Sequence, residues 1–266
     1  MPNFTSIGNL SHPTLLFLHG FLGNKEDWKE IIAPLSSKYR CIALDLPGHG
    51  KIPYNSDCCP YVLQFIADQK LTHVTLVGYS TGGRIALEIS ENNSFSLNLE
   101  TADCSINRLI ILSSHLGLTT DSERELCWEK DLHWISLLEK GSMKDFLDKW
   151  YEQPIFSTLK QDTALFKKIK SRRELLDPHQ MALFLSKQSL SKKPPISQVK
   201  LPSLFLYGKE DLKYAELYSK LTSSILETCC IENASHAIHL ENPLDCARVI
   251  NNWLENTCLT SKVNPK

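Results

Sequence analysis

The chain reads VTLVGYSTGGR from Val74 to Arg84. An apolar, β-branched run ends here in Gly-Tyr-Ser-Thr-Gly, and the apolar residues of 85–89 follow at helical spacing. A strand, a sharp turn and a helix in this order are typical of a nucleophile elbow, which holds a serine hydroxyl at the top of a β-sheet. The pattern therefore predicts that Ser80 is a catalytic nucleophile rather than part of a plain glycine-rich turn.

The glycines of this motif have a physical purpose. The turn forces the backbone of Ser80 into a strained conformation, and only small residues fit where strand and helix approach closely. Gly78 and Gly82 lack the Cβ atom that would block this approach. The start of the following helix also brings backbone N–H groups and a positive dipole end beside any anion that forms at Ser80.

Short apolar runs alternate with helical patterns on both sides of this stretch. The runs lie at residues 14–18, 41–46, 108–114, 203–207 and 228–231. Continuous apolar runs of this length are typical of buried parallel strands. The alternation predicts an α/β protein with a mostly parallel central sheet flanked by helices on both faces.

One long segment departs from this alternation. From His115 to Pro195 no strand-like run occurs, whereas apolar residues recur at intervals of three and four. A helical block between two strand–helix halves is best interpreted as an insertion. We therefore expect a core of residues 1–114 and 196–266 and a helical cap, or lid, of residues 115–195.

Composition argues against several classes of partner. A net charge of -1 gives no electrostatic reason for binding nucleic acid or an anionic membrane. The first six residues lack the features of a signal peptide, and no run is long enough to span a membrane. The nine cysteines include two adjacent pairs and no C-x-x-C motif, which favours free thiols. We expect a cytoplasmic protein that acts on a small molecule, with no metal and no other cofactor.

A serine nucleophile needs two partners. An imidazole must take its proton, and a carboxylate must fix the tautomer of that imidazole. In elbow proteins the three groups follow in the order Ser, acid, His, each after a strand. Asp211 and His236 each follow an apolar run in the second half of the chain. Glu210 and His239 are the neighbouring alternatives, and the loop positions favour Ser80, Asp211 and His236 as the catalytic triad.

An oxyanion hole requires two backbone donors that point at one position. The amide of Thr81, directly after the nucleophile, is one candidate. The His19-Gly20-Phe21 segment after the first apolar run supplies the second, for which we select the Phe21 amide.

Several motifs together resemble the α/β-hydrolase superfamily. They are FLHGF at 17–21, DLPGHG at 45–50 and the elbow. Within that superfamily the chain is similar to the 2-succinyl-6-hydroxy-2,4-cyclohexadiene-1-carboxylate (SHCHC) synthases of menaquinone biosynthesis. The segments that carry this similarity are GYSTGGR at 78–84, WYEQPIF at 150–156, GKEDLK at 208–213 and SHAIHLENP at 235–243. The resemblance covers nearly the whole chain and implies an α/β-hydrolase fold with a helical cap.

The resemblance also implies a reaction. In that family the triad removes a proton and drives loss of pyruvate from 2-succinyl-5-enolpyruvyl-6-hydroxy-3-cyclohexene-1-carboxylate, without hydrolysing an ester. It implies a carbon–oxygen lyase in which Ser80, activated by His236, is the general base. It also implies a small polycarboxylate substrate and no cofactor.

The family's substrate carries three carboxylates, so the resemblance implies several cations in the pocket. Arg84, Arg124 and Lys213 are the implied carboxylate ligands, although Arg84 alone could equally be a solvated helix residue. Tyr79 and Trp150 are implied to line the pocket, and packing between cap helices is the alternative for Trp150.

Other functions remain open on sequence alone. A carboxylesterase or thioesterase can use the same triad, because one fold and one triad support many reactions. A cationic pocket favours the lyase, whereas an apolar pocket favours an esterase. A non-catalytic receptor that has kept the fold is a third possibility, against which the intact triad argues. The charged run at 170–173 adds further cations, whose orientation the sequence leaves open.

Overall fold

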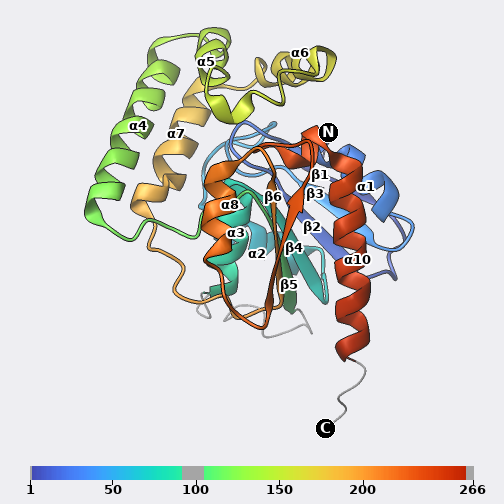
Figure 1. Cartoon of the computed structure of the whole chain (residues 1–266). Helices are drawn as coiled ribbons and strands as arrows, with labels where there is room; N and C mark the ends of the chain where they lie inside the picture. Colours follow the sequence, from blue (N-terminus) through green and yellow to red (C-terminus); the bar gives the residue numbers. More distant parts are fainter. Residues whose placement is uncertain (1, 92–104, 262–266) are drawn as a thin grey trace.

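A seven-stranded sheet forms the centre of the computed structural model, which describes residues 2–91 and 105–261 (Figure 1). The strand order is β1-β3-β2-β4-β5-β6-β7, and only the β1–β3 pair is antiparallel. The strands are β1 (Phe4–Ile7), β2 (Thr14–Leu18), β3 (Arg40–Leu44), β4 (Val74–Tyr79), β5 (Ile106–Leu112), β6 (Ser203–Gly208) and β7 (Leu226–Ile231). The α/β class and the mostly parallel sheet are confirmed.

Helices cover both faces of the sheet, as predicted. One face carries η1 (Lys25–Trp28), α1 (Lys29–Leu35), α9 (Ile238–Glu241) and α10 (Pro243–Ser261). The other carries α2 (Cys58–Asp68), α3 (Thr81–Glu91) and α8 (Leu212–Ser219). Strand side chains alternate between the two faces, so that Leu15 and Phe17 pack with the first set and Leu16 and Leu18 with the second.

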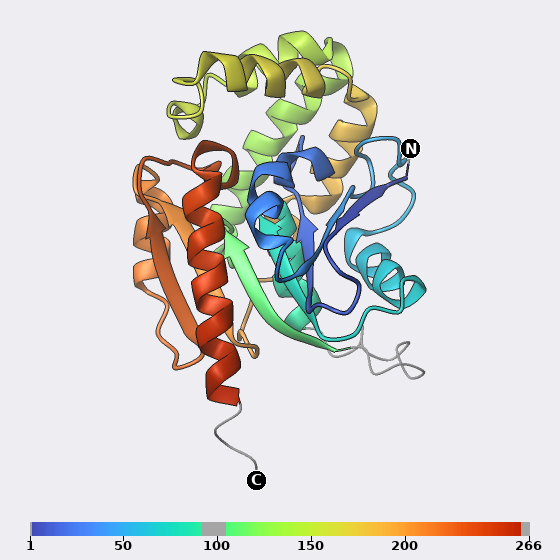
Figure 2. The same cartoon turned by 90° about the vertical axis from the view of Figure 1, so that its right-hand side faces the viewer.

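Between β5 and β6 the described chain forms helices only. They are α4 (Asp121–Lys140), α5 (Met143–Trp150), η3 (Pro154–Phe156), α6 (Thr163–Arg173), α7 (Pro178–Gln188) and η4 (Leu190–Lys192). The α-helices begin at N-caps whose side chains accept a backbone N–H, namely Thr120, Ser142, Asp162 and Asp177. Figures 1 and 2 show α4 to α7 beyond the carboxyl ends of the strands. The limits of a cap domain at 115 and 195 stay a prediction.

The parallel strands bring distant loops together. Because the carboxyl ends of parallel strands meet at one edge, the residues after β2, β4, β6 and β7 lie at the same edge of the sheet. That edge faces α4 to α7 (Figure 2). Across the described residues no helix is long and apolar enough to cross a membrane, and the described cysteines are all free.

Candidate active site

The elbow has the geometry that its sequence predicts. Ser80 lies between β4 and α3 with a φ of +50°, a left-handed conformation that is strained for serine. A Cβ atom on Gly78 would lie 2.5 Å from the carbonyl oxygen of Gly82, and one on Gly82 would lie 2.1 Å from the carbonyl oxygen of Leu18. Neither contact is possible for a real Cβ atom, so both positions require glycine.

Asp211 and His236 meet at the edge of the sheet. The Nδ1 atom of His236 lies 3.0 Å from Oδ2 of Asp211, and both side chains are buried. A proton on Nδ1 that is donated to this carboxylate leaves Nε2 as the acceptor nitrogen. The ring of Tyr79, the neighbour of Ser80, lies 5.4 Å from the ring of His236. No hydrogen bond joins Ser80 to His236 in the described structure; in ligand-free sites such contacts are often long.

The backbone next to His236 is held by a carboxylate. The amide of Ser235 donates to Oε2 of Glu241 at 2.5 Å. Burial raises the pKa of Glu241 to about 7, against the opposing effect of the amides that it accepts. Glu241 therefore fixes the loop that presents the imidazole, a role that its sequence position alone did not indicate.

The two alternative triad members lie in different surroundings. Glu210 is exposed beside Asp211 and makes no hydrogen bond or ion pair with a histidine ring within the described chain. His239 is buried between the rings of Trp28 and Tyr79, at centroid distances of 4.9 and 4.1 Å. Both of its ring nitrogens lack a partner, and burial lowers its pKa to about 3. A ring that has no carboxylate partner and resists protonation is poorly suited to act as the base.

The segment after β2 passes directly against the nucleophile. A Cβ atom on Gly20 would lie 3.2 Å from Cβ of Ser80, so this loop and the elbow touch. In the part of the chain that the structure describes, the amides of Phe21 and Thr81 donate to no protein acceptor. Both candidate oxyanion donors are thus unpaired and lie on segments adjacent to Ser80.

Two buried histidines hold this loop in place. Nε2 of His19 accepts the amide of Leu46 at 3.0 Å, and Nε2 of His49 accepts the amide of Leu22 at 3.2 Å. Burial lowers the pKa of both rings. They therefore stay neutral at physiological pH and can accept these bonds, which explains the histidines of FLHGF and DLPGHG.

A cavity of about 170 Å³ opens beside Ser80. The core lines it with Ser80, Thr81 and Tyr214, and α4 and α7 line it from the other side. His115 is also in the lining, and burial, followed by the charges of Lys213 and Arg84, lowers its pKa to about 4. Asp131 is the carboxylate in the same lining, so the cavity has charges of both signs around it.

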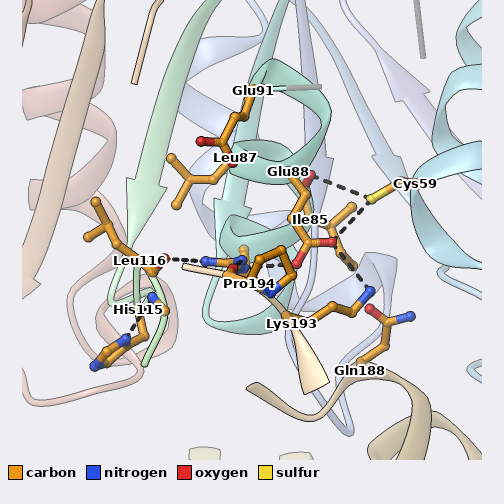
Figure 3. Close-up of polar contacts among 12 residues, drawn as sticks. Cys59, Ile85, Leu87, Glu88, Glu91, His115, Leu116, Gln188, Lys193 and Pro194 are labelled. Atoms are coloured by element: carbon orange, nitrogen blue, oxygen red, sulfur yellow. Dashed lines mark hydrogen bonds and ion pairs between the residues drawn. The ribbon is translucent and has the colours of Figure 1, made fainter. Parts of the chain in front are cut away.

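Arg84 borders the cavity but is engaged by the protein itself. Its Nε donates to Glu88 at 2.8 Å, Nη1 donates to the carbonyl of Leu116 and Nη2 to the carbonyl of Pro194. Figure 3 shows these three acceptor residues, Glu88, Leu116 and Pro194, close to one another. Arg84 is buried, so the alternative of a solvated helix residue is wrong. Its three guanidinium nitrogens donate one bond each to the protein, which leaves two of the five N–H groups unused. Its role as a carboxylate ligand therefore stays a prediction. Helical spacing places the residue correctly but says nothing of partners 32 and 110 positions away.

The other predicted substrate-binding residues are spread around the site. Lys213 is exposed, with Nζ 5.6 Å from the ring centre of Tyr214. Arg124 is half-buried in the first turn of α4, and its Nε is buried with no partner among the described residues. Trp150 lies 5.2 Å from the ring of Phe21 and 4.9 Å from that of Trp134, so it packs against α4 and also reaches the loop after β2.

Two arginines of α6 come close to the site, which the sequence left open. Arg173 is buried, donates to the Tyr151 hydroxyl and has Nη2 3.5 Å from Asp27. Arg172 donates to the same carboxylate. The charge of Arg173 also favours ionisation of Tyr79, although burial holds the pKa of that phenol well above its ordinary value. Of the α6 cations, Arg173 therefore lies near enough to Tyr79 to act on its charge.

Comparison with known proteins agrees with this fold. A family model described as the alpha/beta hydrolase family matches residues 15–249. A Haemophilus influenzae protein provisionally named as an SHCHC synthase is 33% identical over 261 residues, which cover 94% of this chain and 99% of that protein. The SHCHC synthase of Citrobacter koseri is 27% identical, over 89% of this chain and 91% of its own length.

A solved structure supports the fold. MenH from S. aureus matches with a TM-score of 0.85 at 24% identity, over 96% of this chain and 99% of that one. The family model and the Haemophilus relative both extend over nearly the whole chain, cap segment included. The chain therefore belongs to the alpha/beta hydrolase family and, within it, to the SHCHC synthase family.

Proposed function

We propose that this protein is a lyase that eliminates pyruvate from 2-succinyl-5-enolpyruvyl-6-hydroxy-3-cyclohexene-1-carboxylate to give SHCHC, in menaquinone biosynthesis. The observation that carries the proposal is the buried Asp211–His236 pair at the same edge of the sheet as the strained Ser80, which borders a cavity. The near full-length relatives named SHCHC synthase support the choice of reaction.

In the proposed mechanism Ser80 takes a proton from an acidic carbon of the substrate and passes its own proton to Nε2 of His236. Asp211 accepts the Nδ1–H bond and stabilises the imidazolium that forms. The electron pair of the broken C–H bond forms a C=C bond as the C–O bond to the enolpyruvyl group breaks. The enolate of pyruvate leaves with the electrons of that C–O bond, takes the proton from Nε2 of His236 and tautomerises to pyruvate. The amides of Phe21 and Thr81 hold the oxyanion that develops on the substrate.

Carboxylate recognition falls to the cations around the cavity. We assign Arg124 and Lys213 as candidate carboxylate ligands, and Tyr79 and Trp150 as pocket walls. Arg124 has an unpaired, buried Nε, and Lys213 perturbs the pKa of a cavity-lining histidine. Cations at these positions would suit a small polycarboxylate better than the apolar ester of a typical carboxylesterase.

Residues 115–195 act in this proposal as the cap that covers the site and excludes water from it. The cavity lies between the elbow and two helices of this segment, which supports that role. We also infer a cytoplasmic location, with which the free thiols of the described cysteines are consistent.

The decisive experiment measures pyruvate release from the enolpyruvyl precursor by wild type and Ser80→Ala, with p-nitrophenyl esters assayed in parallel. We expect rapid pyruvate release that depends on Ser80, and slow ester cleavage. Rapid ester or thioester cleavage without pyruvate would instead identify a hydrolase. Tight binding of the precursor without turnover, equal in wild type and Ser80→Ala, would identify a receptor.

A further inference from the structure

The first observation concerns which segments Arg84 joins. Its acceptor Leu116 lies on the segment from β5 into α4, and its acceptor Pro194 lies on the segment from η4 back to β6. These two segments are the crossings between the sheet and the helical block. Figure 3 shows Leu116 and Pro194 on neighbouring segments with Glu88 beside them. One buried guanidinium therefore bonds to both crossings at once.

The crossings are packed tightly against each other around this arginine. The amide of Ile196 donates to the carbonyl of Leu116 at 2.6 Å. Gly117 has a φ of +129°, and a Cβ atom there would lie 2.3 Å from Cα of Pro195 and 3.2 Å from Nη1 of Arg84. The carbonyl of Leu116, on the first crossing, thus accepts from the Ile196 amide on the second crossing and from Arg84. Loosening either of these two hydrogen bonds affects the other.

Glu88 completes the arrangement from the next turn of α3. Its Oε1 accepts from Nε of Arg84 at 2.8 Å, and its Oε2 lies 3.3 Å from Nζ of Lys193, which directly precedes Pro194 (Figure 3). The side chains of this ion pair are largely buried, at 6% exposure for Arg84 and 14% for Glu88. Buried charges of this kind persist only where both partners are present and well oriented.

The same arginine is rigidly linked to the nucleophile. Its amide donates to the carbonyl of Ser80 at 3.0 Å, and the Ser114 hydroxyl donates to that carbonyl at 2.7 Å. Ser114 stands just ahead of the first crossing. A displacement of either crossing would therefore be transmitted to the backbone of Ser80 and to the placement of the cap helices above it.

We propose that Arg84 is a positioning residue which, with Glu88, fastens both crossings to the nucleophile helix and so sets where the cap stands over Ser80. The planar guanidinium suits this role, because it can reach a carboxylate and two carbonyls in fixed directions, which a lysine ammonium cannot. The catalytic consequence rests on the proposed lyase function, whereas the structural part does not.

The test compares Arg84→Met and Glu88→Gln with Glu216→Gln. Glu216 pairs with Lys220 at the same i,i+4 spacing on α8 but is exposed, so it is the matched control. Hydrogen–deuterium exchange of the Ile196 amide reports directly on the crossings. We expect exchange to accelerate by at least about tenfold in Arg84→Met and Glu88→Gln, through easier local opening, and to stay unchanged in the control. Far-UV circular dichroism and the exchange of β2 and β4 amides show whether each variant is folded. If Arg84→Met is not folded, Arg84→Lys is used in its place.

Kinetics separate fastening from ligand binding. Glu88→Gln keeps the charge of Arg84. If Arg84 fastens the crossings, both Glu88→Gln and Arg84→Met raise KM for the precursor. If Arg84 binds a carboxylate, Arg84→Met raises KM with normal Ile196 exchange, while Glu88→Gln leaves both values unchanged, and that result overturns the proposal. Should the protein release no pyruvate at all, the lyase proposal fails, and the exchange experiment alone still decides the role of Arg84.

Discussion

Nδ1 of His236 lies 3.0 Å from Oδ2 of Asp211, with both side chains buried. This contact is made between the loops that follow β6 and β7, which are neighbouring strands of the sheet. A fixed carboxylate next to one ring nitrogen selects the tautomer in which the other nitrogen can take a proton. His239, three residues later, has no such partner, and so the chemistry is assigned to one histidine.

Replacing Asp211 with Asn should therefore impair the chemical step. An amide can present its NH₂ group to Nδ1 and favour the wrong tautomer, so we expect kcat for pyruvate release to fall by about 10²–10⁴ with little change in KM. Glu210→Gln, the adjacent exposed carboxylate, is the control and should retain wild-type kcat. Equal losses in the two variants would show that Asp211 has no special role.

Local motifs made the fold and the elbow predictable from sequence. The buried strands are continuous apolar runs, and β2 coincides with its predicted range of 14–18. β1 was not predicted, because its four residues are half-exposed and lie at an antiparallel edge, without an apolar run. Contacts between distant segments were not predictable either. Spacing places Arg84 one turn after Ser80, but only the fold brings Leu116 and Pro194 to it.

His239 should make the stability depend on pH. Burial lowers its pKa to about 3, whereas the unfolded chain has a histidine pKa near the ordinary 6.5. Below pH 6.5 the unfolded chain thus binds a proton that the folded chain excludes until about pH 3. The free energy of unfolding therefore decreases as the pH is lowered from 6.5 to about 3. Replacing His239 with Phe should flatten this slope and add about 1 kcal/mol at pH 7, since two unpaired buried nitrogens are lost. Urea unfolding at pH 5 and pH 7 tests this, with exposed His179→Phe as the control; an unchanged slope would refute it.

Gly82 should tolerate no side chain. A Cβ atom there would lie 2.1 Å from the carbonyl oxygen of Leu18 and 2.5 Å from that of His19, and both are backbone atoms that cannot rotate away. We expect Gly82→Ala to lower the free energy of unfolding by about 3 kcal/mol, because β2 and α3 must separate. Gly141→Ala is the control, since its nearest contact is 3.0 Å and its φ is −121°. Similar midpoints in urea for both variants would show that the elbow is looser than its geometry indicates.

Asp27 should stabilise the packing of α6 on the core through its ion pairs. Its carboxylate is buried in η1 and pairs with Arg172 and Arg173, whose charges hold its pKa below the ordinary value in spite of burial. Asp27→Asn leaves the buried Arg173 without its counter-charge, so we expect a loss of about 3–5 kcal/mol in unfolding free energy. The wild-type advantage should also disappear as the pH falls through the folded-state pKa, because the depressed pKa contributes stability only while the carboxylate is ionised. Glu255→Gln breaks the exposed Lys38 pair and should change stability by less than about 1 kcal/mol. If the two variants unfold at the same urea concentration, the Asp27 pair contributes no more than a surface ion pair, and α6 must be held by its apolar contacts instead.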